Sequence, residues 1–443
     1  MKPNTKKLVF FLLIGLSAVI IIGTVVYFSF LRSTITFQEI QLSQLLKSDT
    51  STSKFEIFSE SITVFDNQIF PVVILATSNT EKKLNESIKD GIFIGDISGI
   101  LGCSIIVSLT PSINNNLFNN NKNIPIRLEI EGTRFINKSI IETEIYPEIK
   151  YNIFPKINYN YALLENNLQP SFENIIFRIY INDKLIKEFF KTIQIRGINE
   201  VPFLLLSDDG EMVDFSWLFV TFVNEDNPII DQILKEALEV GIIDVFNGTR
   251  SKNNSFFGYQ GSEKDLFNQL FAIWNVFQRR GIKYSSITTT SSTSEKVVSQ
   301  YVRTFSDIIN ANQANCADGS ILFASVFRKI GIDPFLVFLP GHMMVGVWKD
   351  ENHSGWVALE TTILGNENIN NYIDDKTFLL GKLAWFFGIS KNEISRDEFI
   401  YAINNGTKSV NANIDEFNDI KNDEYQVLDI LTARRAGISN INK

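Results

Sequence analysis

The strongest constraint on this chain is an apolar run near its start. Residues 8–31, LVFFLLIGLSAVIIIGTVVYFSFL, form 24 consecutive positions without a charge, and about 20 apolar residues suffice to cross a bilayer as a helix. A cleaved signal peptide is the alternative, but its apolar region is typically only about 7–15 residues long and ends at a small-residue cleavage site. This run is longer and no such site follows it. It therefore predicts an uncleaved transmembrane helix.

The charges around the run predict its orientation. Lys2, Lys6 and Lys7 precede it, and only Arg32 follows closely, so the positive-inside rule places the N-terminus in the cytoplasm. We therefore expect a single-pass membrane protein in which residues 1–32 are a cytoplasmic tip and anchor and the main body is extracytoplasmic. That body has 37 basic and 50 acidic residues, and such an acidic surface argues against nucleic acid as a partner.

Residues 54–197 have the pattern of β-strands. Short apolar or alternating runs such as FEIFSESITVF and NIIFRIYIND are separated by Asn-rich turns such as NNNLFNNNKN. Several short strands at this spacing predict an antiparallel sandwich, and we expect an all-β immunoglobulin-like domain that follows a stalk at residues 33–53. This domain contains no histidine, which argues against acid–base chemistry there.

After Gly197 the pattern becomes mixed. Helical periodicity is present in three segments, residues 231–240, 262–280 and 297–309. We therefore predict an α+β domain over residues 198–443, with its core at about 262–365 and a C-terminal helical extension at 366–443 that packs against that core. The predicted fold class of the whole chain is α+β, consisting of an N-terminal transmembrane helix, the β-sandwich and this domain.

The two cysteines, Cys103 and Cys316, are 213 positions apart. Two cysteines at this separation do not form a disulfide framework, and their pairing, which the sequence leaves open, would join two different predicted domains. With only two histidines there is no zinc cluster, and no loop has calcium-binding spacing. We expect neither a metal nor a cofactor.

Cys316 lies where a loop becomes a helix. The apolar pattern of residues 317–329, ADGSILFASVFRK, predicts a helix with Asn315 as its N-cap. Unpaired N–H groups and the positive end of the helix dipole favour a thiolate in the first turn. The plain alternative is that Cys316 is an inert, buried apolar residue.

A base for this thiol is sought among two histidines, both within 40 residues after Cys316. His342 opens the run HMMVGVW, and GWVALETT follows a polar turn, which together predict a hairpin. If the hairpin is centred on Glu351, His342 faces Glu360, and directly opposed Cβ atoms lie about 4.5–5.5 Å apart. One carboxylate then orients one imidazole, as in a catalytic triad. His353 falls in the turn.

This order of residues resembles the transglutaminase-like superfamily. His342 follows Cys316 by 26 positions and Glu360 follows by 18 more. The resemblance is carried by NCADGSILFASVFRKIGIDPFLVFLPGHMMVGVW and WVALETT, and the upstream LFAIWNVFQRRGIKYSS is similar to the helix and Tyr that precede the nucleophile in bacterial members. It implies a papain-like core with Cys316 as nucleophile, His342 as general base and acid, and Glu360 as orienting carboxylate. The family usually has Asp at the last position.

Three further residues are candidates for the site. Gln313 or Trp274 would help to stabilise an oxyanion, although Gln is common in polar loops and Trp274 also fits a core position. For Asp318 we expect first the role of a negative charge near the N-terminus of a helix. A role in lining the site comes second.

Two functions remain open. The first is a bacterial, membrane-anchored cysteine-dependent amide hydrolase or acyl transferase, of peptidase or transglutaminase type, that acts on a protein or peptide substrate in the cell envelope, at the periplasm or cell surface. The second is a catalytically inactive transglutaminase-like module that serves as an envelope binding or scaffolding protein. The inactive module stays open as an alternative because this chain has Glu360 where the family usually has Asp.

Overall fold

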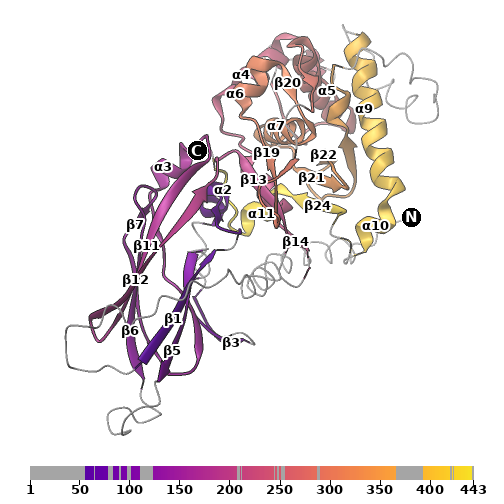
Figure 1. Cartoon of the computed structure of the whole chain (residues 1–443). Helices are drawn as coiled ribbons and strands as arrows, with labels where there is room; N and C mark the ends of the chain where they lie inside the picture. The colour runs from indigo at the N-terminus through magenta and orange to yellow at the C-terminus, as the bar shows by residue number, and fades with distance from the viewer. Residues whose placement is uncertain are drawn as a thin grey trace. The chain divides into compact units, whose positions relative to one another are not determined.

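The structure is a computed structural model with several sheets and a mixed α/β composition (Figure 1). It describes residues 55–441 with gaps at 64, 78–82, 89–90, 97–100, 110–122, 207–209, 211, 244, 247–248, 251–254, 287–289, 366–392, 420–421 and 423. The chain divides into two compact units. The N-terminal unit holds the described residues up to Phe215 and also Ser292–Ser299, and the C-terminal unit holds Ser216–Ser291 and the described residues from Gln300 onward.

The predicted fold class with an N-terminal transmembrane helix, and the predicted single-pass membrane localisation, are wrong for the described chain. None of the helices within the described ranges is both long enough and apolar enough to cross a membrane. The longest of them, α9 (Glu393–Ala412), has 20 residues but carries Glu, Asp, Arg and Lys side chains along its length. The apolar run at residues 8–31 and the predicted stalk at 33–53 lie outside the described residues.

The N-terminal unit contains two five-stranded sheets. In strand order, the first consists of β1 (Phe55–Thr63), β5 (Leu101–Leu109), β9 (Lys150–Phe154), β4 (Gly91–Asp96) and β3 (Lys83–Ile88). The second consists of β2 (Gln68–Ile69), β12 (Lys184–Ile195), β11 (Ser171–Ile181), β6 (Ile124–Glu131) and β8 (Ser139–Ile145). Buried and more exposed side chains alternate along β11, because one face of the strand packs on the core.

The strand pairing corrects the antiparallel sandwich that the sequence predicted. β4 pairs with β9 in parallel, and β12 pairs with β2 in parallel. Parallel pairing needs a long crossover connection, and the chain between β4 and β9 supplies one by running through β5, β6, β7 (Ile136–Asn137) and β8. Local alternation of apolar residues does not distinguish these two kinds of pairing.

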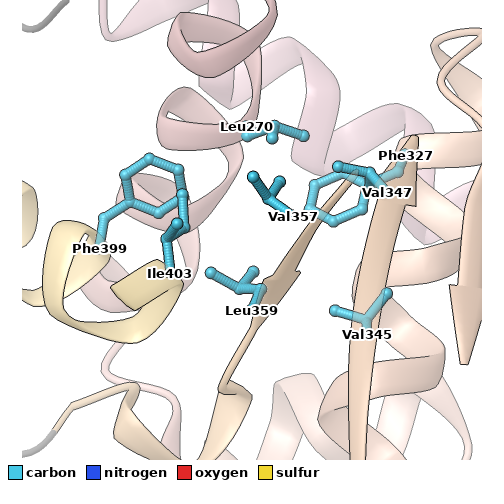
Figure 2. A pocket seen from close by; sticks show the side chains of 8 residues that line it. All are labelled: Leu270, Phe327, Val345, Val347, Val357, Leu359, Phe399 and Ile403. Atoms are coloured by element: carbon cyan, nitrogen blue, oxygen red, sulfur yellow. The ribbon is translucent and has the colours of Figure 1, made fainter. Parts of the chain in front are cut away.

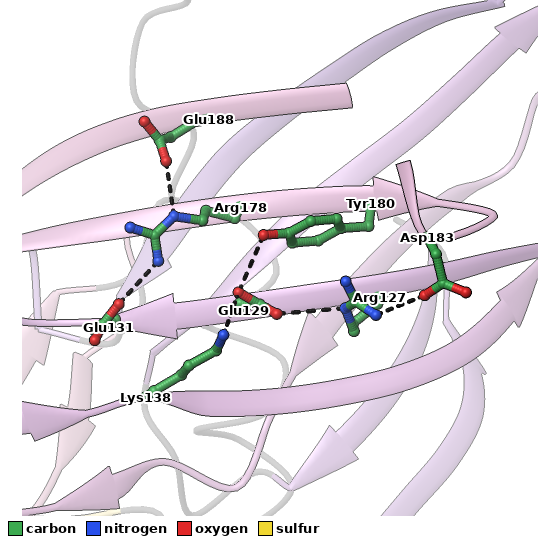
Figure 3. A network of polar contacts seen from close by, with 8 residues as sticks. All are labelled: Arg127, Glu129, Glu131, Lys138, Arg178, Tyr180, Asp183 and Glu188. Carbon is green, nitrogen blue, oxygen red and sulfur yellow. Dashed lines mark hydrogen bonds and ion pairs between the residues drawn. The ribbon is translucent and has the colours of Figure 1, made fainter. Parts of the chain in front are cut away.

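The second sheet carries a compensated network of charges on β6, β11 and β12 (Figure 3). Arg178 contacts Glu131 at 2.8 Å and Glu188 at 2.7 Å, and the half-buried Arg127 lies over the Tyr180 ring. The remaining members are Glu129, Lys138 and Asp183. Opposite charges on neighbouring strands stabilise the pairing, so this network has a structural explanation.

The remaining elements of the N-terminal unit are short. They are α2 (Pro71–Thr77), β10 (Asn158–Tyr159) and α3 (Tyr161–Glu165). A four-stranded sheet has the order β14 (Met212–Asp214), β13 (Glu200–Leu206), β19 (Val297–Tyr301) and β18 (Thr290–Ser292). β19 corrects the helix predicted over 297–309. Its residues pair with a strand distant in sequence, and the helix α6 (Phe305–Ala311) begins only after Thr304, whose side chain caps it.

The C-terminal unit is built on a four-stranded sheet with helices packed on it. In order, the sheet consists of β23 (Trp356–Leu359), β22 (His342–Trp348), β21 (Pro334–Leu339) and β24 (Gln426–Asp429). The larger helices besides α9 are α4 (Pro228–Glu239), α5 (Glu263–Arg279) and α7 (Cys316–Lys329). The smaller elements are η3 (Ser216–Phe222), β15 (Val245–Phe246), β16 (Thr249–Arg250), β17 (Lys283–Tyr284), β20 (Gln313–Ala314), η4 (Thr361–Ile363), α10 (Ile414–Asn418) and α11 (Ile430–Arg435).

The core of this unit is apolar and aromatic. α5 begins at a capping box formed by Ser262 and Asp265, and it buries Leu266, Leu270 and Phe277 among other apolar residues. A cavity of about 10 Å³ lies between the sheet and α5, α7 and α9, lined by Leu270, Phe327, Val345, Val347, Val357, Leu359, Phe399 and Ile403 (Figure 2). A wholly apolar space of this size holds no substrate.

Candidate active site

Cys316 is the first residue of α7 and carries a free, half-buried thiol. The Asn315 side chain accepts a hydrogen bond from the Asp318 N–H at 2.8 Å, and the Asp318 carboxylate accepts one from the Asn315 N–H at 3.1 Å. These two bonds form a capping box and confirm the predicted N-cap. The sulfur therefore lies in the first turn of the helix, where the N–H groups lack partners within the helix.

Asp318 has a structural role in this arrangement. Its carboxylate is fully buried and accepts hydrogen bonds from the Arg303 backbone N–H at 2.8 Å and from Arg303 Nη1 at 2.7 Å. Together with the capping bond, these contacts occupy both of its oxygens. Asp318 therefore fixes the start of α7, in line with the expectation that it is first a helix charge.

Small side chains bring the first turn of α7 close to the sheet. A Cβ atom at Gly319 would lie 3.0 Å from Oγ1 of Thr361, so a larger residue would push the helix away from η4. Ser320 is buried, and its hydroxyl donates to the Met343 carbonyl at 3.3 Å. Because Met343 follows His342, this packing sets the thiol beside the start of β22.

The hairpin between β22 and β23 has a register two residues away from the predicted one. Trp348 pairs with Trp356 instead of facing Ser354. The turn sets this register, since the Asp350 side chain accepts hydrogen bonds from two backbone N–H groups within it and His353 adopts a φ of 53°. A two-residue shift leaves the same side chains on the same face.

His342 and Glu360 meet as predicted, although they are not directly opposed. Nε2 of His342 lies 2.6 Å from Oε2 of Glu360, and Oε1 accepts hydrogen bonds from the Thr362 N–H at 3.0 Å and from its hydroxyl at 2.6 Å. Burial would raise the pKa of Glu360, but the bond and charge of His342 and the Thr362 bonds outweigh burial, so the pKa lies below its ordinary value. The carboxylate is therefore ionised and held at both oxygens.

The imidazole of His342 also contacts the thiol. Burial would lower the pKa of His342, but hydrogen bonds to Cys316 and Glu360, together with their charges, raise it to about 10. An imidazolium is thus the favoured form at neutral pH. A thiol, an imidazole and a carboxylate are in contact in that order, which is the arrangement of a nucleophile, a base and an orienting group.

Tyr284 is the tyrosine of the upstream segment that carries part of the family resemblance, and it lies on a strand beside the start of α7. Its strand β17 pairs in parallel with β20, so that Tyr284 is paired with Ala314, two positions before Cys316. The pKa of Tyr284 is raised by burial first and then by the neighbouring Cys316 and Glu360. Gln313 lies on β20 beside the site and is half-buried. This pairing is long-range and leaves no local pattern in the sequence.

Two other candidates lie elsewhere. Trp274 has no exposed surface, and its ring stacks on Phe323 at a centroid distance of 5.5 Å, so it belongs to the core. His353 stacks on Trp348 at 4.6 Å and lies 3.1 Å from Asp333, at the turn end of the hairpin. His342 is therefore the histidine that serves this site.

The described residues offer no obvious place for a metal ion, since no group of three or more of their His, Cys, Asp and Glu side chains is arranged to hold one. Comparison with protein-family models, with curated proteins and with solved structures finds no match to this chain. The resemblance to the transglutaminase-like superfamily therefore rests on the residues that carry it, and membership of that superfamily stays a prediction.

Proposed function

We propose that this protein is a thiol-dependent amide hydrolase or acyl transferase in which Cys316, His342 and Glu360 carry the reaction. The observation that supports the proposal most directly is the contact between the imidazole and both of its partners, a thiol at a helix N-terminus and a carboxylate 2.6 Å away. Each residue has a plain structural explanation when taken singly. Their convergence from α7, β22 and the residue after β23 is what a catalytic site requires.

In the first half of the proposed reaction, the Cys316 thiolate attacks the carbonyl carbon of an amide. A C–S bond forms while the carbonyl π electrons move to oxygen, and in this proposal N–H groups at the start of α7 stabilise that oxyanion. The His342 imidazolium then donates its proton to the amide nitrogen, the C–N bond breaks, and the amine leaves. A thioester remains on Cys316, and the imidazole is neutral.

The second half returns the enzyme to its starting state. Neutral His342 takes a proton from water or from an amine acceptor, which attacks the thioester carbonyl and releases the thiolate. Glu360 keeps its charge throughout and stabilises the imidazolium each time it forms. Water gives hydrolysis and an amine gives transfer, so one thioester serves both outcomes. Hydrolysis of a peptide bond is our leading version.

The proposal is tested by acylation of Cys316 with p-nitrophenyl acetate, followed by mass spectrometry of the protein and its tryptic peptides. We expect a thioester on Cys316 in the wild type and none in Cys316→Ala. Cys103→Ala is the matched control, because Cys103 is fully buried in the other unit, and it should acylate as the wild type does. An unreactive wild type, or equal acylation of Cys316→Ala, would refute the proposal.

A second measurement separates hydrolysis from transfer. Peptides with a free glutamine side chain or an internal amide are incubated with the wild type in the presence and absence of glycine methyl ester. Peptide cleavage indicates a hydrolase, and incorporation of the ester indicates a transferase. Either product must disappear in Cys316→Ala.

A further inference from the structure

The Glu360 carboxylate is divided between two partners. Oε2 contacts Nε2 of His342 at 2.6 Å, and Oε1 accepts the Thr362 backbone N–H at 3.0 Å and the Thr362 hydroxyl at 2.6 Å. One residue therefore holds one oxygen with two donors, while the other oxygen faces the imidazole. A carboxylate fixed at Oε1 rotates little, so the direction of Oε2 is fixed as well.

Glutamate has a particular need for such a restraint. Its side chain has one more rotatable bond than aspartate, and ordering a long polar side chain costs conformational entropy. A carboxylate that samples several rotamers would contact His342 for only part of the time. The hydroxyl of Thr362, a β-branched residue with restricted χ1, removes much of that freedom.

The backbone of Glu360 is fixed independently of its side chain. Its N–H donates to the carbonyl of Ala402 on α9 at 3.1 Å. A Cβ atom at Gly406 would lie 2.9 Å from the Glu360 nitrogen, so α9 packs directly against this point of the chain. The main chain is therefore held by α9, and the side chain is held by Thr362.

From these contacts we infer that Thr362 is a positioning residue of this site, which orients His342 by fixing the Glu360 carboxylate and so allows the longer acid to serve as the third member of the site. The inference rests on the proposed function where activity is concerned. Its effect on the imidazole is independent of any reaction, because the contact between Glu360 and His342 exists in the free protein.

The test uses Thr362→Val, which keeps the β-branched shape and the backbone N–H and removes only the hydroxyl. We expect acylation by p-nitrophenyl acetate to slow about tenfold, because small misplacements of a catalytic group have large effects. We also expect the titration midpoint of His342, followed by NMR of ¹⁵N-histidine-labelled protein, to fall below that of the wild type. Thr362→Ser restores the hydroxyl and should recover both values.

The control is Thr192→Val, which removes an exposed hydroxyl that donates to Asn174 at 2.7 Å in the N-terminal unit. It should change neither the acylation rate nor the titration of His342. The two histidine signals are separated with His353→Gln. If Thr362→Val titrates and acylates as the wild type does, Thr362 does not position this site. If the wild type itself is not acylated, the proposed function fails, and the His342 titration still decides the role of Thr362.

Discussion

The imidazole of His342 lies 2.6 Å from the carboxylate of Glu360, although the β22–β23 register pairs neither residue with the other. Extending the pairing of Val345 with Leu359 would bring Thr362, not Glu360, opposite His342. The contact is therefore diagonal, and the extra methylene of Glu, compared with Asp, spans the additional distance. The length of this side chain and the register of the hairpin thus fit each other.

The first prediction concerns the length and charge of this acid. Glu360→Asp shortens the side chain and should slow acylation of Cys316 about tenfold, because the shorter carboxylate no longer reaches the imidazole. Glu360→Gln keeps the length but cannot stabilise an imidazolium, and it should slow acylation further, by about 100-fold. Pre-steady-state acylation by p-nitrophenyl acetate measures both. An Asp variant faster than the wild type would contradict the fit of Glu to the diagonal contact.

The second prediction concerns the selectivity of thiol modification. Cys316 is half-buried beside an imidazole, whereas Cys103 has no exposed surface and burial raises its pKa to about 12. Iodoacetamide at pH 6–7 should therefore alkylate Cys316 alone in the native protein, and both cysteines in urea. Peptide mass spectrometry identifies the modified residue.

The contribution of the imidazole to this reactivity is tested in His342→Ala. Alkylation of Cys316 at pH 6 should fall about tenfold or more in this variant, because the thiolate loses its cationic partner. Cys103 should remain unmodified in the native state. Equal alkylation rates in the wild type and the variant would show that the imidazole does not activate the thiol.

The third prediction concerns pH and stability. The pKa of His342 is about 10 in the folded protein and about 6.5 in an unfolded chain, so the folded state binds this proton more tightly. The stabilisation is complete below about pH 6.5 and is lost as the pH rises through about 10. Glu360 has the opposite dependence, because its pKa is lower in the folded protein than in the unfolded chain. Its stabilisation is complete above the unfolded-state pKa and is lost as the pH falls through the folded-state pKa.

Urea unfolding of the wild type and His342→Gln between pH 6 and pH 10.5 checks this dependence. The difference in the free energy of unfolding between them should shrink by at least about 1 kcal/mol over that range, since one pKa unit is worth about 1.4 kcal/mol. His353→Gln, which alters the histidine at the turn, should not reproduce this change. A pH-independent difference between the wild type and His342→Gln would contradict the raised pKa.

The fourth prediction concerns the packing of α9 on β23. Gly406→Ala in an open helix position would be stabilising by up to about 1 kcal/mol. Here the new Cβ would lie 2.6 Å from the Ala358 carbonyl oxygen and 2.9 Å from the Glu360 nitrogen, and overpacking costs about 1–3 kcal/mol. We expect a net destabilisation in urea unfolding and slower acylation, because Glu360 is displaced.

Lys408→Ala is the control for this helix, since Lys408 is exposed on α9. It should leave the acylation rate unchanged and the free energy of unfolding within about 0.5 kcal/mol of the wild type. A Gly406→Ala protein that is more stable than the wild type and equally active would show that β23 and α9 do not depend on this close approach.

Several features of the site were predictable because they depend on neighbouring residues. Asn315 and Asp318 form a capping box within four positions of each other, and the apolar pattern after Cys316 indicates the helix that they start. The alternating residues after His342 likewise indicate a strand, and its partner follows after a polar turn. The predicted hairpin register was wrong by two residues, but such a shift leaves Glu360 on the same face of the sheet. The predicted contact between Glu360 and His342 therefore still forms.

Other features depend on contacts between distant segments, which no local pattern records. Whether Val297–Tyr301 forms a helix or a strand was decided by its place in a sheet with β13, where tertiary pairing overrides periodicity. Trp274 was a candidate for stabilising an oxyanion, yet its ring packs against Phe323 in the core. The parallel pairing of Tyr284 with Ala314 likewise has no local signal, and only the family resemblance pointed to this tyrosine.

The sequence by itself determined the chemistry available to this protein, namely a helix-start thiol, two histidines and an acid at a suitable spacing, because caps and periodicity act over a few residues. Only the tertiary structure decided which of these groups meet, through the hairpin turn that sets the register, the small residues that let α7 approach η4, and the contacts of Thr362 and α9 with Glu360. Caps and strand periods are local properties, whereas register, core packing and the geometry of a site arise from many weak contacts made together by segments far apart in the chain.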